Sequence, residues 1–442
     1  GRTREEVLAS LKATRGMVWE SIDQLVHERG HKVLSELKIR GWSPDVNNLL
    51  RRSSLVFDLL TNRNTGGIIA GPDVQSGIES APGYAAVWSR DAAWTLIGAL
   101  SLGHAGLARQ MLEFAIATQS PEGLWLHRHH TDYSLASSWG LHQIDETGIL
   151  LFSFDCYLQT SGDVEFVENN WQTIAKAADF LQGIGQRKKF LSVDLWEERE
   201  GYHLYTIAST IAGLRATVRM ANRIFPSRPS NSSGWAATAD KLQASAVSDF
   251  WNEELGRFLP SQLISSALPM VDNDRPELSA KVQAQDFRPT TALPQYPNWR
   301  DSAVEELNFR HDVSVLAMAV PFQILDIHDS RLTRTVEKLR RELWNSQVGG
   351  FCRYEGDSYG GGNPWPLATL WLAIFEGASG KIEECKSLVD WVVSHTTPAG
   401  LVPEQVHRQH GTPVAAVPLS WSHAMVAIAV AAAQGTNVWK LS

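Results

Sequence analysis

The chain has 442 residues with 43% hydrophobic and 20% charged residues, the balance of an ordinary globular protein. Its net charge of -8 and its lack of a basic cluster argue against nucleic acid or an anionic membrane as a partner. The longest uninterrupted apolar run, Ala424 to Ala433, is shorter than the roughly 18 residues that suggest a membrane span.

Three cysteines, Cys156, Cys352 and Cys385, are too few and too scattered for a disulfide framework or a zinc site. Scattered thiols favour a reducing compartment. The first residues, Gly1 to Glu5, also carry no apolar segment of the kind found in signal peptides. These observations lean towards a cytoplasmic location and leave the compartment open.

Helical spacing of apolar residues dominates the chain. The first expected element is an amphipathic helix from Glu5 to about Glu28, within an N-terminal helical extension over residues 1–45. In the last expected helix, Ser420 is the predicted N-cap and Gly435 the stop. Gly, Pro or Ser clusters separate the remaining expected helices, which cover residues 104–118, 146–160, 168–183, 205–222, 311–325 and 364–377.

Some of these helices are amphipathic, whereas the one after Ser420 is apolar nearly all round and must be buried on every side. No alternating β pattern of any length and no βαβ rhythm occurs. The mixture predicts an all-α fold in two layers, an inner ring of helices inside an outer one. Periodicity alone leaves a helical barrel, a large bundle and a solenoid open.

Residues 259–301 differ in composition, with six prolines from Pro260 to Pro297 and few periodic apolar positions. A domain linker would have this composition, but helical patterning of the same kind resumes after it. We interpret the segment as a long excursion within a single domain over residues 1–442, of the kind that often serves function.

Two acidic motifs lie far apart, Asp194-Leu195-Trp196-Glu197-Glu198 and Pro403-Glu404-Gln405. Hydrolysis of a bond between sugars needs two carboxyl groups in different protonation states, and aromatic faces on which the sugar rests. Desolvation by the neighbouring Trp196 is expected to raise the pKa of a carboxyl here and favour a proton donor. Adjacent glutamates on a helix surface are commonly just solvated, so the motif alone leaves that interpretation open.

Seventeen tryptophans are the anomaly of the composition. Most are expected to be structural. Several, however, lie among hydrogen-bonding residues between the expected helices, as a sugar site requires, because a pyranose offers apolar faces and a rim of hydroxyls. These are Trp88, Trp139, Trp196, Trp365 and Trp421.

Taken together and in this order, the motifs from about Leu49 to Trp421 resemble glycoside hydrolase family 15, the glucoamylase family, especially its bacterial and archaeal branch. The similar segments are Tyr84…Trp88-Ser89-Arg90-Asp91, Ser138-Trp139-Gly140…Asp145-Glu146, Asp194 to Glu198 with Arg199 and Gly201, Arg353-Tyr354…Asp357…Tyr359…Asn363-Pro364-Trp365, and Pro403-Glu404-Gln405 followed by Leu419 to His423.

The resemblance implies an (α/α)6 barrel with six inner and six outer helices and an active-site pocket at one end. It implies Glu197 as general acid and Glu404 as general base. The other implied site residues bind the substrate: Arg90, Asp91 and Arg353 hold the sugar, Tyr84 lies near the base and its water, Glu198 assists the next sugar, and Trp88, Trp139, Trp196 and Trp421 wall the pocket. Glu198 has an equally simple interpretation as a solvated glutamate.

The implied activity is exo-acting and inverting, with release of β-D-glucose from the non-reducing ends of α-glucans or oligosaccharides. Inversion requires room for a water, so the two carboxyl groups are expected to lie roughly 6.5–9.5 Å apart. A glucodextranase acting on α-1,6 links, a trehalase of the same family, or a non-catalytic carbohydrate-binding barrel protein remain alternatives. Bacterial relatives commonly carry a β-sandwich ahead of the barrel, and only about 45 residues precede the resemblance here.

No cofactor and no metal is expected. His127, His129, His130 and Asp132 superficially resemble a metal site, but their spacing fits no strong ligand pattern, and a polar loop at the pocket rim is the preferred interpretation. The run from Asp272 to Asp274 lacks the glycine and the distal glutamate of a calcium-binding EF-hand loop.

Overall fold

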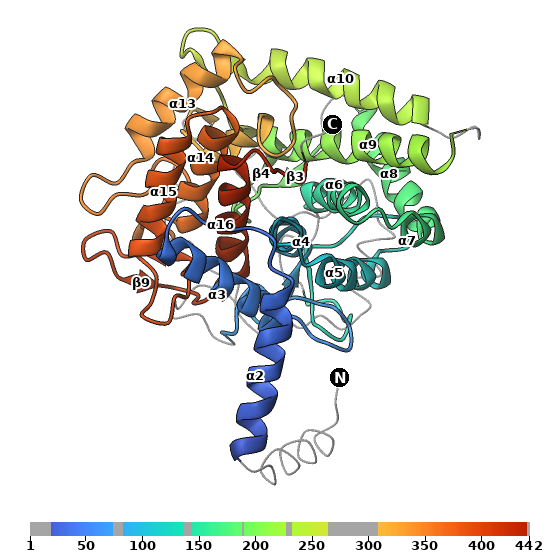
Figure 1. Ribbon diagram of the computed structural model, residues 1–442. Helices are drawn as coiled ribbons and strands as arrows, with labels where there is room; N and C mark the ends of the chain where they lie inside the picture. Colours follow the sequence, from blue (N-terminus) through green and yellow to red (C-terminus); the bar gives the residue numbers. More distant parts are fainter. Residues whose placement is uncertain are drawn as a thin grey trace.

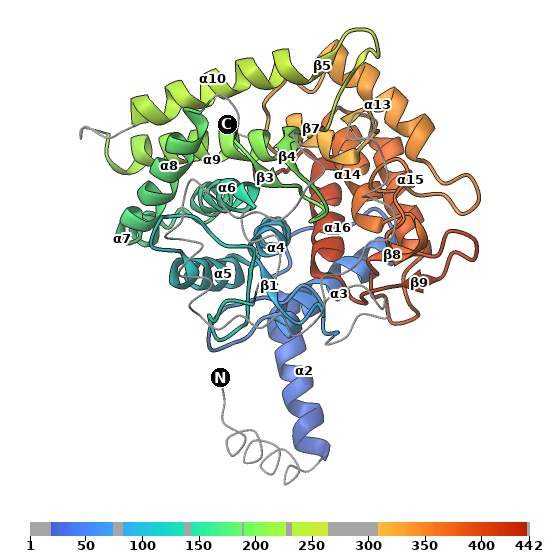
Figure 2. The same ribbon diagram turned by 180° about the vertical axis from the view of Figure 1, so that it is seen from behind.

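The structure, a computed structural model, describes residues 19–73, 83–136, 143–187, 190–226, 232–263 and 308–439. Within these residues, six buried segments form a closed inner ring in which each packs against the next (Figures 1 and 2). In ring order they are α4 (Ser89–Leu102), α6 (Ile144–Ser161), α9 (Leu204–Ile224), the 3-10 helix η1 (Val313–Met318), α14 (Pro366–Ala378) and α16 (Ser420–Ala433).

Outer helices alternate with the inner ones along the chain and cover them. They are α3 (Pro44–Leu60), α5 (Ala105–Thr118), α8 (Trp171–Gly185), α10 (Ser232–Phe250), α13 (Ser330–Leu343) and α15 (Ile382–Ser394). A short helix, α7 (Val164–Asn169), precedes α8. The architecture is therefore the (α/α)6 barrel, and the predicted fold class is confirmed.

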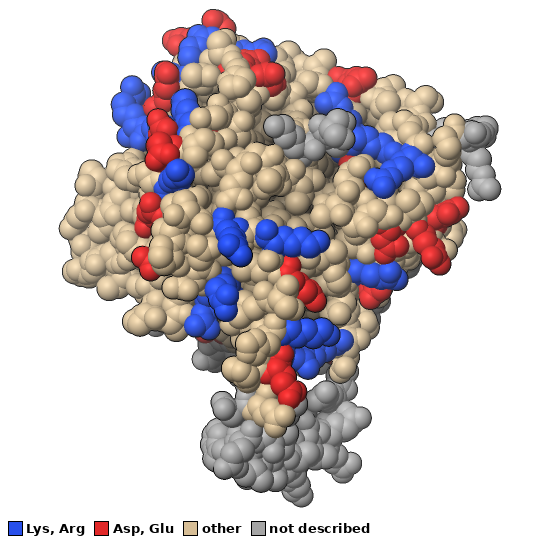
Figure 3. Space-filling model, in the orientation of Figure 1, with Lys and Arg blue, Asp and Glu red and all other residues tan. Residues whose placement is uncertain are grey.

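Burial follows the sequence pattern of each layer. In the inner α14, every residue from Pro366 to Gly377 is buried, because the helix is surrounded by both rings. The outer α13 buries a single stripe, Leu332, Val336, Leu339 and Leu343 among its members, at the three-to-four-residue spacing of one helix face. Charged residues of both signs are scattered over the outer surface shown in Figure 3.

The inner helices α6 and α9 approach closely through two glycines. A Cβ atom at Gly148 would lie 2.4 Å from the backbone oxygen of Ser209, and one at Gly213 would lie 2.6 Å from the oxygen of Gly148. Any larger residue at either position would force the two helices apart.

Most predicted helices are confirmed within a few residues. Of the helix predicted from Glu5 to about Glu28, the part before Trp19 lies outside the described residues. The described part is α2 (Trp19–Ser35), which ends later than predicted and projects from the barrel in Figure 1. Leu419, and not Ser420, occupies the N-cap of α16. Among the described residues, no helix combines the length and the apolar character needed to cross a membrane.

The helix predicted over 311–325 is wrong. The structure has η1 over Val313–Met318, followed by turns. Pro321 has no N–H to donate and its ring crowds the preceding turn, so it stops a helix that the apolar pattern alone would extend. The apolar residues of this segment are buried all the same, because it fills the fourth place in the inner ring. Of the 259–301 excursion, everything beyond Leu263 lies outside the described residues.

Short strands that sequence periodicity did not indicate brace the loops at one end of the barrel. β1 (Val87–Trp88) pairs with β2 (Arg128–His129), and β8 (Gln405–Val406) pairs with β9 (Pro413–Val414). β3 (Ser192–Val193), β4 (Glu200–His203) and β7 (Ser261–Leu263) form a three-stranded sheet. A further pair, β5 (Trp251–Asn252) and β6 (Arg257–Phe258), follows α10.

Candidate active site

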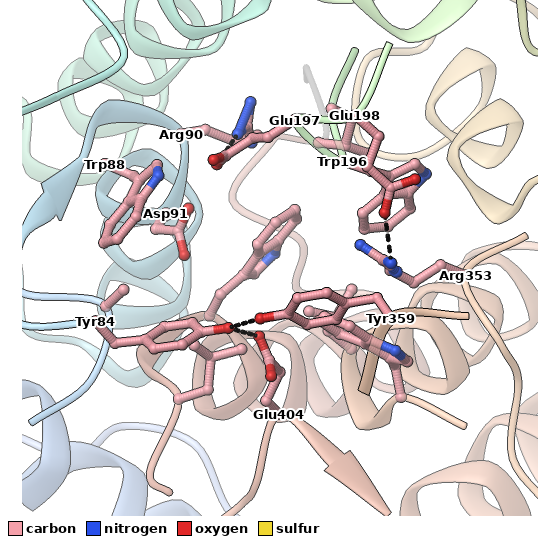
Figure 4. Close-up of a pocket in the computed structure, with 16 residues that line it drawn as sticks. Tyr84, Trp88, Arg90, Asp91, Trp196, Glu197, Glu198, Arg353, Tyr359 and Glu404 are labelled. Atoms are coloured by element: carbon pink, nitrogen blue, oxygen red, sulfur yellow. Dashed lines mark hydrogen bonds and ion pairs between the residues drawn. The ribbon is translucent and has the colours of Figure 1, made fainter. Parts of the chain in front are cut away.

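A pocket lies where the loops that enter the inner helices converge, and its empty volume including the open mouth is about 680 Å³. Figure 4 shows Glu197 and Glu404 on opposite sides of it. Its lining consists of Ala70, Tyr84, Trp88, Arg90, Asp91, Leu195, Trp196, Glu197, Glu198, Arg353, Tyr359, Trp365, Leu367, Glu404, Leu419 and Trp421. Every predicted site residue within the described residues is in this set; Trp139 lies outside the described residues.

Glu197 is held on a tight turn between β3 and β4. Its φ angle is +65°, in the left-handed region that non-glycine residues rarely adopt. Asp194 fixes the turn, since its Oδ1 accepts hydrogen bonds from the backbone N–H groups of Glu198 (2.8 Å) and Arg199 (3.2 Å). Its Oδ2 also accepts one from Arg199 Nε at 3.0 Å. The turn thereby presents the Glu197 carboxyl to the pocket.

The side chain of Arg90, in the first turn of α4, extends to the Glu197 carboxyl group. Its Nη1 and Nη2 atoms both donate to Gln143 Oε1 at 2.8 Å, and Nη1 also donates to Asp145 Oδ2 at 3.0 Å. Nη2 lies 3.4 Å from Glu197 Oε1. The guanidinium is almost wholly buried, and its Nη hydrogens are directed at these protein groups, so in this structure Arg90 positions Glu197 as well as lining the pocket.

Two further basic side chains face Glu197. The Nε2 atom of His127 lies 2.8 Å from Glu197 Oε2, and the charge of Arg128, the next residue in the chain, also acts on this carboxyl group. Burial raises the pKa of Glu197, but the charge and hydrogen bond of a protonated His127 and the charges of Arg90 and Arg128 outweigh burial and lower it to about 2.

The expectation that Trp196 raises the pKa of Glu197 is therefore wrong for the free protein. The Trp196 indole donates from Nε1 to Asp312 Oδ2 at 2.9 Å, a partner 116 residues away in the chain. The charges that act on Glu197 instead come from Arg90 in α4, from His127 in the loop before β2 and from Arg128 in β2. Their charges, and not the adjacent tryptophan, decide the direction of the shift.

Glu404 is surrounded by uncharged donors. Tyr84 Oη donates to its Oε1 at 2.5 Å, and Gln405 Nε2 donates to its Oε2 at 3.2 Å. Tyr359 Oη lies 2.7 Å from Tyr84 Oη and extends this chain of hydroxyls. Burial raises the pKa of Glu404 to about 7, although the Tyr84 hydrogen bond and the Arg353 charge oppose the rise.

Arg353 stands at the other side of the pocket, between Asp357 and Glu198. It donates to both Asp357 oxygens at 2.8 Å and to Glu198 Oε1 at 2.9 Å. The hydroxyl of Tyr354 also donates to Glu198. Four aromatic rings lie 4.6–5.2 Å from the Arg353 guanidinium carbon, those of Trp196, Tyr354, Tyr359 and Trp365. Glu198 is thus an ion-paired pocket residue, and not a solvated glutamate.

Asp91 and Trp421 complete the inner end of the pocket. Burial raises the pKa of Asp91 to about 7, although Arg90 opposes the rise. The Trp421 ring stacks on Trp94, with centroids 5.9 Å apart, and its Nε1 is buried without a hydrogen-bond partner in the protein. A protonatable carboxyl group and a tryptophan whose N–H has no partner in the protein thus line the same pocket, which suits a ligand rich in hydroxyls.

Sequence reasoning did not assign three residues that shape the site. Tyr359 belongs to the motif that begins at Arg353 and lines the pocket, but it is not among the predicted site residues. Gln143 and His127 contact Arg90 and Glu197, and the only signal for His127 was its place in a histidine-rich stretch. Among the described residues, no group of three or more His, Cys, Asp or Glu side chains is arranged to hold a metal ion. The run from Asp272 to Asp274 lies outside them.

A pocket with opposed carboxyl groups, walled by tryptophans at one end of an (α/α)6 barrel, is typical of helical-barrel glycoside hydrolases. Residues 47–431 match the profile of glycosyl hydrolases family 15, and the chain belongs to this family.

Two curated relatives are each 28% identical to the chain. One is described as an uncharacterized glycosyl hydrolase of Methanocaldococcus jannaschii and is matched over 396 residues, 87% of this chain and 55% of the relative. The other is glucoamylase 1 of Rhizopus oryzae, matched over 217 residues, 44% of this chain and 34% of the relative. The chain thus spans about half the length of the first relative and a third of the second.

Solved structures share the fold. A bacterial glucoamylase in complex with acarbose superimposes with a TM-score of 0.74 at 17% identity, over 99% of this chain and 63% of that one. A glycosidase solved as the wild type gives a TM-score of 0.67 at 21% identity, over 89% of this chain and 99% of that one. At these identities the likeness supports the barrel architecture alone.

Proposed function

We propose that the protein is an exo-acting, inverting α-glucoside hydrolase of glucoamylase type, which releases β-D-glucose from non-reducing ends. The observation that carries this proposal is the pair of carboxyl groups on opposite sides of one pocket, Glu197 among basic groups and Glu404 among hydroxyls. Two related proteins are named glucoamylases, and another related glycosidase was solved in complex with glucose.

In this mechanism Glu197 donates a proton to the glycosidic oxygen as the bond to the anomeric carbon breaks. Glu404 takes a proton from a water that attacks the opposite face of the sugar. Tyr84, bonded to Glu404, helps to place that water. Asp91 and Arg353 hold sugar hydroxyls, and Trp88, Trp196 and Trp421 supply apolar walls. Arg90 orients Glu197. Glu198, which is ion-paired with Arg353, assists binding of the second sugar.

The two pKa values of the free protein stand in the opposite order to these roles. With the pKa of Glu197 at about 2 and that of Glu404 at about 7, Glu197 is ionised and Glu404 is protonated near pH 5. The reactive arrangement contains the same number of protons with the proton on Glu197. A glycosidic oxygen that accepts a hydrogen bond favours the acid form of Glu197, and a water that donates to Glu404 favours its ionised form. Substrate binding therefore shifts both groups towards their roles.

The test is an initial-rate panel on maltose, isomaltose, kojibiose, nigerose, trehalose and starch, with the anomer of the first product followed by NMR. We expect turnover of maltose and starch with β-glucose released first. First release of α-glucose would contradict inversion and the two-carboxylate scheme. Preference for isomaltose or trehalose would favour the glucodextranase or trehalase alternative. No turnover of any substrate would favour a binding protein.

A further inference from the structure

We propose that the protein has a second carbohydrate-binding site, on its outer surface around Trp344, which holds a chain of α-linked glucose units outside the pocket. The surface, called the Trp344 platform below, consists of Trp344, Gln347, Val348, Trp391, His395 and Gln409. The proposal deepens the proposed function and rests on it for the identity of the ligand as a glucan.

Trp344 presents its indole to solvent. It is the C-cap residue of α13 and is 41% exposed, more than any other tryptophan whose side chain the structure describes. Its ring meets that of Phe351 edge to face, with centroids 5.2 Å apart and an interplanar angle of 67°. This contact holds the indole in place while much of its surface stays open. A fixed, exposed aromatic ring is a suitable base for a ligand with apolar faces.

A second tryptophan lies beside the first. Trp391, in the last turn of α15, donates from Nε1 to the backbone oxygen of Val348 at 2.8 Å. A Cβ atom at Gly349 would lie 2.7 Å from Trp391 Nε1 and 3.2 Å from Trp344 Cζ2, so the two rings flank one glycine. Gly349 and Gly350 both have a φ angle of +79°. Only glycine combines this backbone with so close an approach of an indole ring.

Three segments that are distant in the sequence hold the platform together. Gln347 Nε2 donates to the backbone oxygen of Gln409 at 3.4 Å, which joins the loop after α13 to the tip of the β8–β9 hairpin. The ring of His395, at the end of α15, lies against that of Trp391 with centroids 4.4 Å apart. A Cβ atom at Gly411 of the hairpin would lie 3.4 Å from His395 Nε2 and 4.0 Å from Val348 Cγ1. The platform is therefore a packed surface rather than a set of separate exposed side chains.

The chemistry of the platform favours an uncharged ligand with hydroxyl groups. None of its six members has a carboxylate, an ammonium or a guanidinium group. Of the charged residues nearby, Arg341 and Glu342 pair with each other at 2.7 Å, and Arg408 donates to the backbone oxygen of Gly361 at 3.3 Å. An acidic peptide or a nucleic acid would require basic groups directed outward.

A pyranose matches the same surface. Its C–H faces pack on indole rings, and its hydroxyls both donate to and accept from amide groups such as those of Gln347 and Gln409. Because the proposed substrate of the pocket is an α-glucan, we assign a glucan chain to the platform as well.

The platform is built on segments that also line the pocket. Single β-bridges join Trp344 to Phe351 and Phe351 to Trp365, and Trp365 lines the pocket. β8 begins directly after Glu404, and β9 lies at the periphery of the molecule below α15 in Figures 1 and 2. A glucan held on the platform would keep its chain ends near the pocket and so raise their effective concentration there.

The test uses β-cyclodextrin, a ring of α-1,4-linked glucose units that has no non-reducing end and is therefore no substrate for an exo-acting pocket. Calorimetric titration should show binding by the wild type and an affinity about 10-fold weaker in Trp344→Ala. Tyr133→Ala is the matched control, because Tyr133 is also 41% exposed but its ring stacks on that of Phe114. This variant should bind as the wild type does.

Kinetics extend the test to substrates. In Trp344→Ala, kcat and KM for maltose should stay within about 2-fold of the wild type, whereas KM for soluble starch should rise by about 3- to 10-fold. An equal loss on both substrates would mean that the change disturbs the pocket wall through Phe351, and would contradict the proposal. Wild-type binding of β-cyclodextrin weaker than about 10 mM, unchanged affinity in Trp344→Ala, or an equal loss in Tyr133→Ala would each overturn it.

NMR keeps the proposal testable if Trp344→Ala does not fold. With ¹⁵N-labelled tryptophan, the indole signal of Trp344 is identified by its absence in Trp344→Phe. This signal should shift when β-cyclodextrin is added to the wild type, and a signal that does not move would contradict the proposal. Binding at Trp344 without turnover of maltose or starch would support the platform and refute the proposed function, and turnover without such binding would do the reverse.

Discussion

The two sides of the pocket present the same functional group in opposite surroundings. Glu197 lies among Arg90, His127 and Arg128, whereas Glu404 is bonded by Tyr84 and Gln405, which carry no charge. Burial acts on both carboxyl groups and raises the pKa of each. Burial decides the direction of the pKa shift at Glu404, whereas at Glu197 the neighbouring positive charges outweigh burial and reverse it.

The largest expected effects on turnover distinguish the proposed roles of Glu197 and Glu404. Glu197→Gln should lower kcat on maltose by about 100- to 10,000-fold but cost far less on α-D-glucosyl fluoride, which needs no proton donor. Glu404→Gln should be as damaging on both substrates, because attack by water needs the base in each case. Initial rates with the two substrates measure this contrast.

Glu113→Gln, on the solvent side of α5, is the control for loss of one carboxylate and should leave both rates unchanged. Near-normal maltose turnover in either pocket variant would refute the assignment of that residue. The reverse substrate pattern would exchange the roles of Glu197 and Glu404.

A smaller effect is expected on the pH dependence of the free energy of unfolding, through the ionisation of Glu404. The folded pKa of Glu404, about 7, lies above its ordinary value of 4.5, so its favourable contribution is present below pH 4.5 and is lost as pH rises through 7. Glu404→Gln removes this loss. The free energy of unfolding of the variant relative to the wild type should therefore increase with pH, by up to about 3 kcal/mol above pH 7. Denaturant titrations from pH 4.5 to 8 measure it, and a difference that stays flat or falls with pH would contradict the raised pKa.

The smallest expected effect comes from Tyr84, whose hydroxyl donates a hydrogen bond to Glu404. Tyr84→Phe removes the hydrogen bond that lowers the pKa of Glu404, so this pKa should rise further. Because the base acts when ionised, the low-pH limb of the kcat profile should move to higher pH and kcat near pH 5 should fall by about 10-fold. A limb that stays in place while kcat falls would assign Tyr84 to the attacking water alone. The isosteric Tyr133→Phe change, on an exposed loop, serves as control.

The fold was predictable because a helix buried on one face has apolar residues at helical spacing, and a helix buried on all faces is apolar throughout. The wholly apolar stretch after Ser420 predicted an inner helix, and the structure has one. The segment around Pro321 was not predicted correctly, because it fills an inner position of the barrel with 3-10 and turn geometry that leaves the apolar pattern unchanged. Strands of two to four residues are too short to show alternation.

The sequence indicated many of the residues that line the pocket, but not the contacts that they make. Motif residues such as Arg90 and Arg353 do line the pocket, yet the sequence does not indicate that Arg90 is bonded to Gln143 or that Arg353 holds Glu198. The pKa shift at Glu197 was predicted with the wrong sign, because the charges of His127, Arg90 and Arg128, which are distant in the sequence, outweigh the effect of burial. Contacts between residues that lie far apart in the sequence depend on how the loops pack in the folded protein, and local sequence patterns do not indicate them.

The left-handed backbone at Glu197 has a consequence for protein engineering. For a residue other than glycine this conformation costs on the order of 1–2 kcal/mol, so Glu197→Gly would relieve local strain and remove the proposed proton donor in one step. A stability-guided redesign of the free protein would therefore rank glycine above glutamate at this position. Position 197 should be held fixed in any such search, since thermostability and turnover make opposite demands on the same backbone angle.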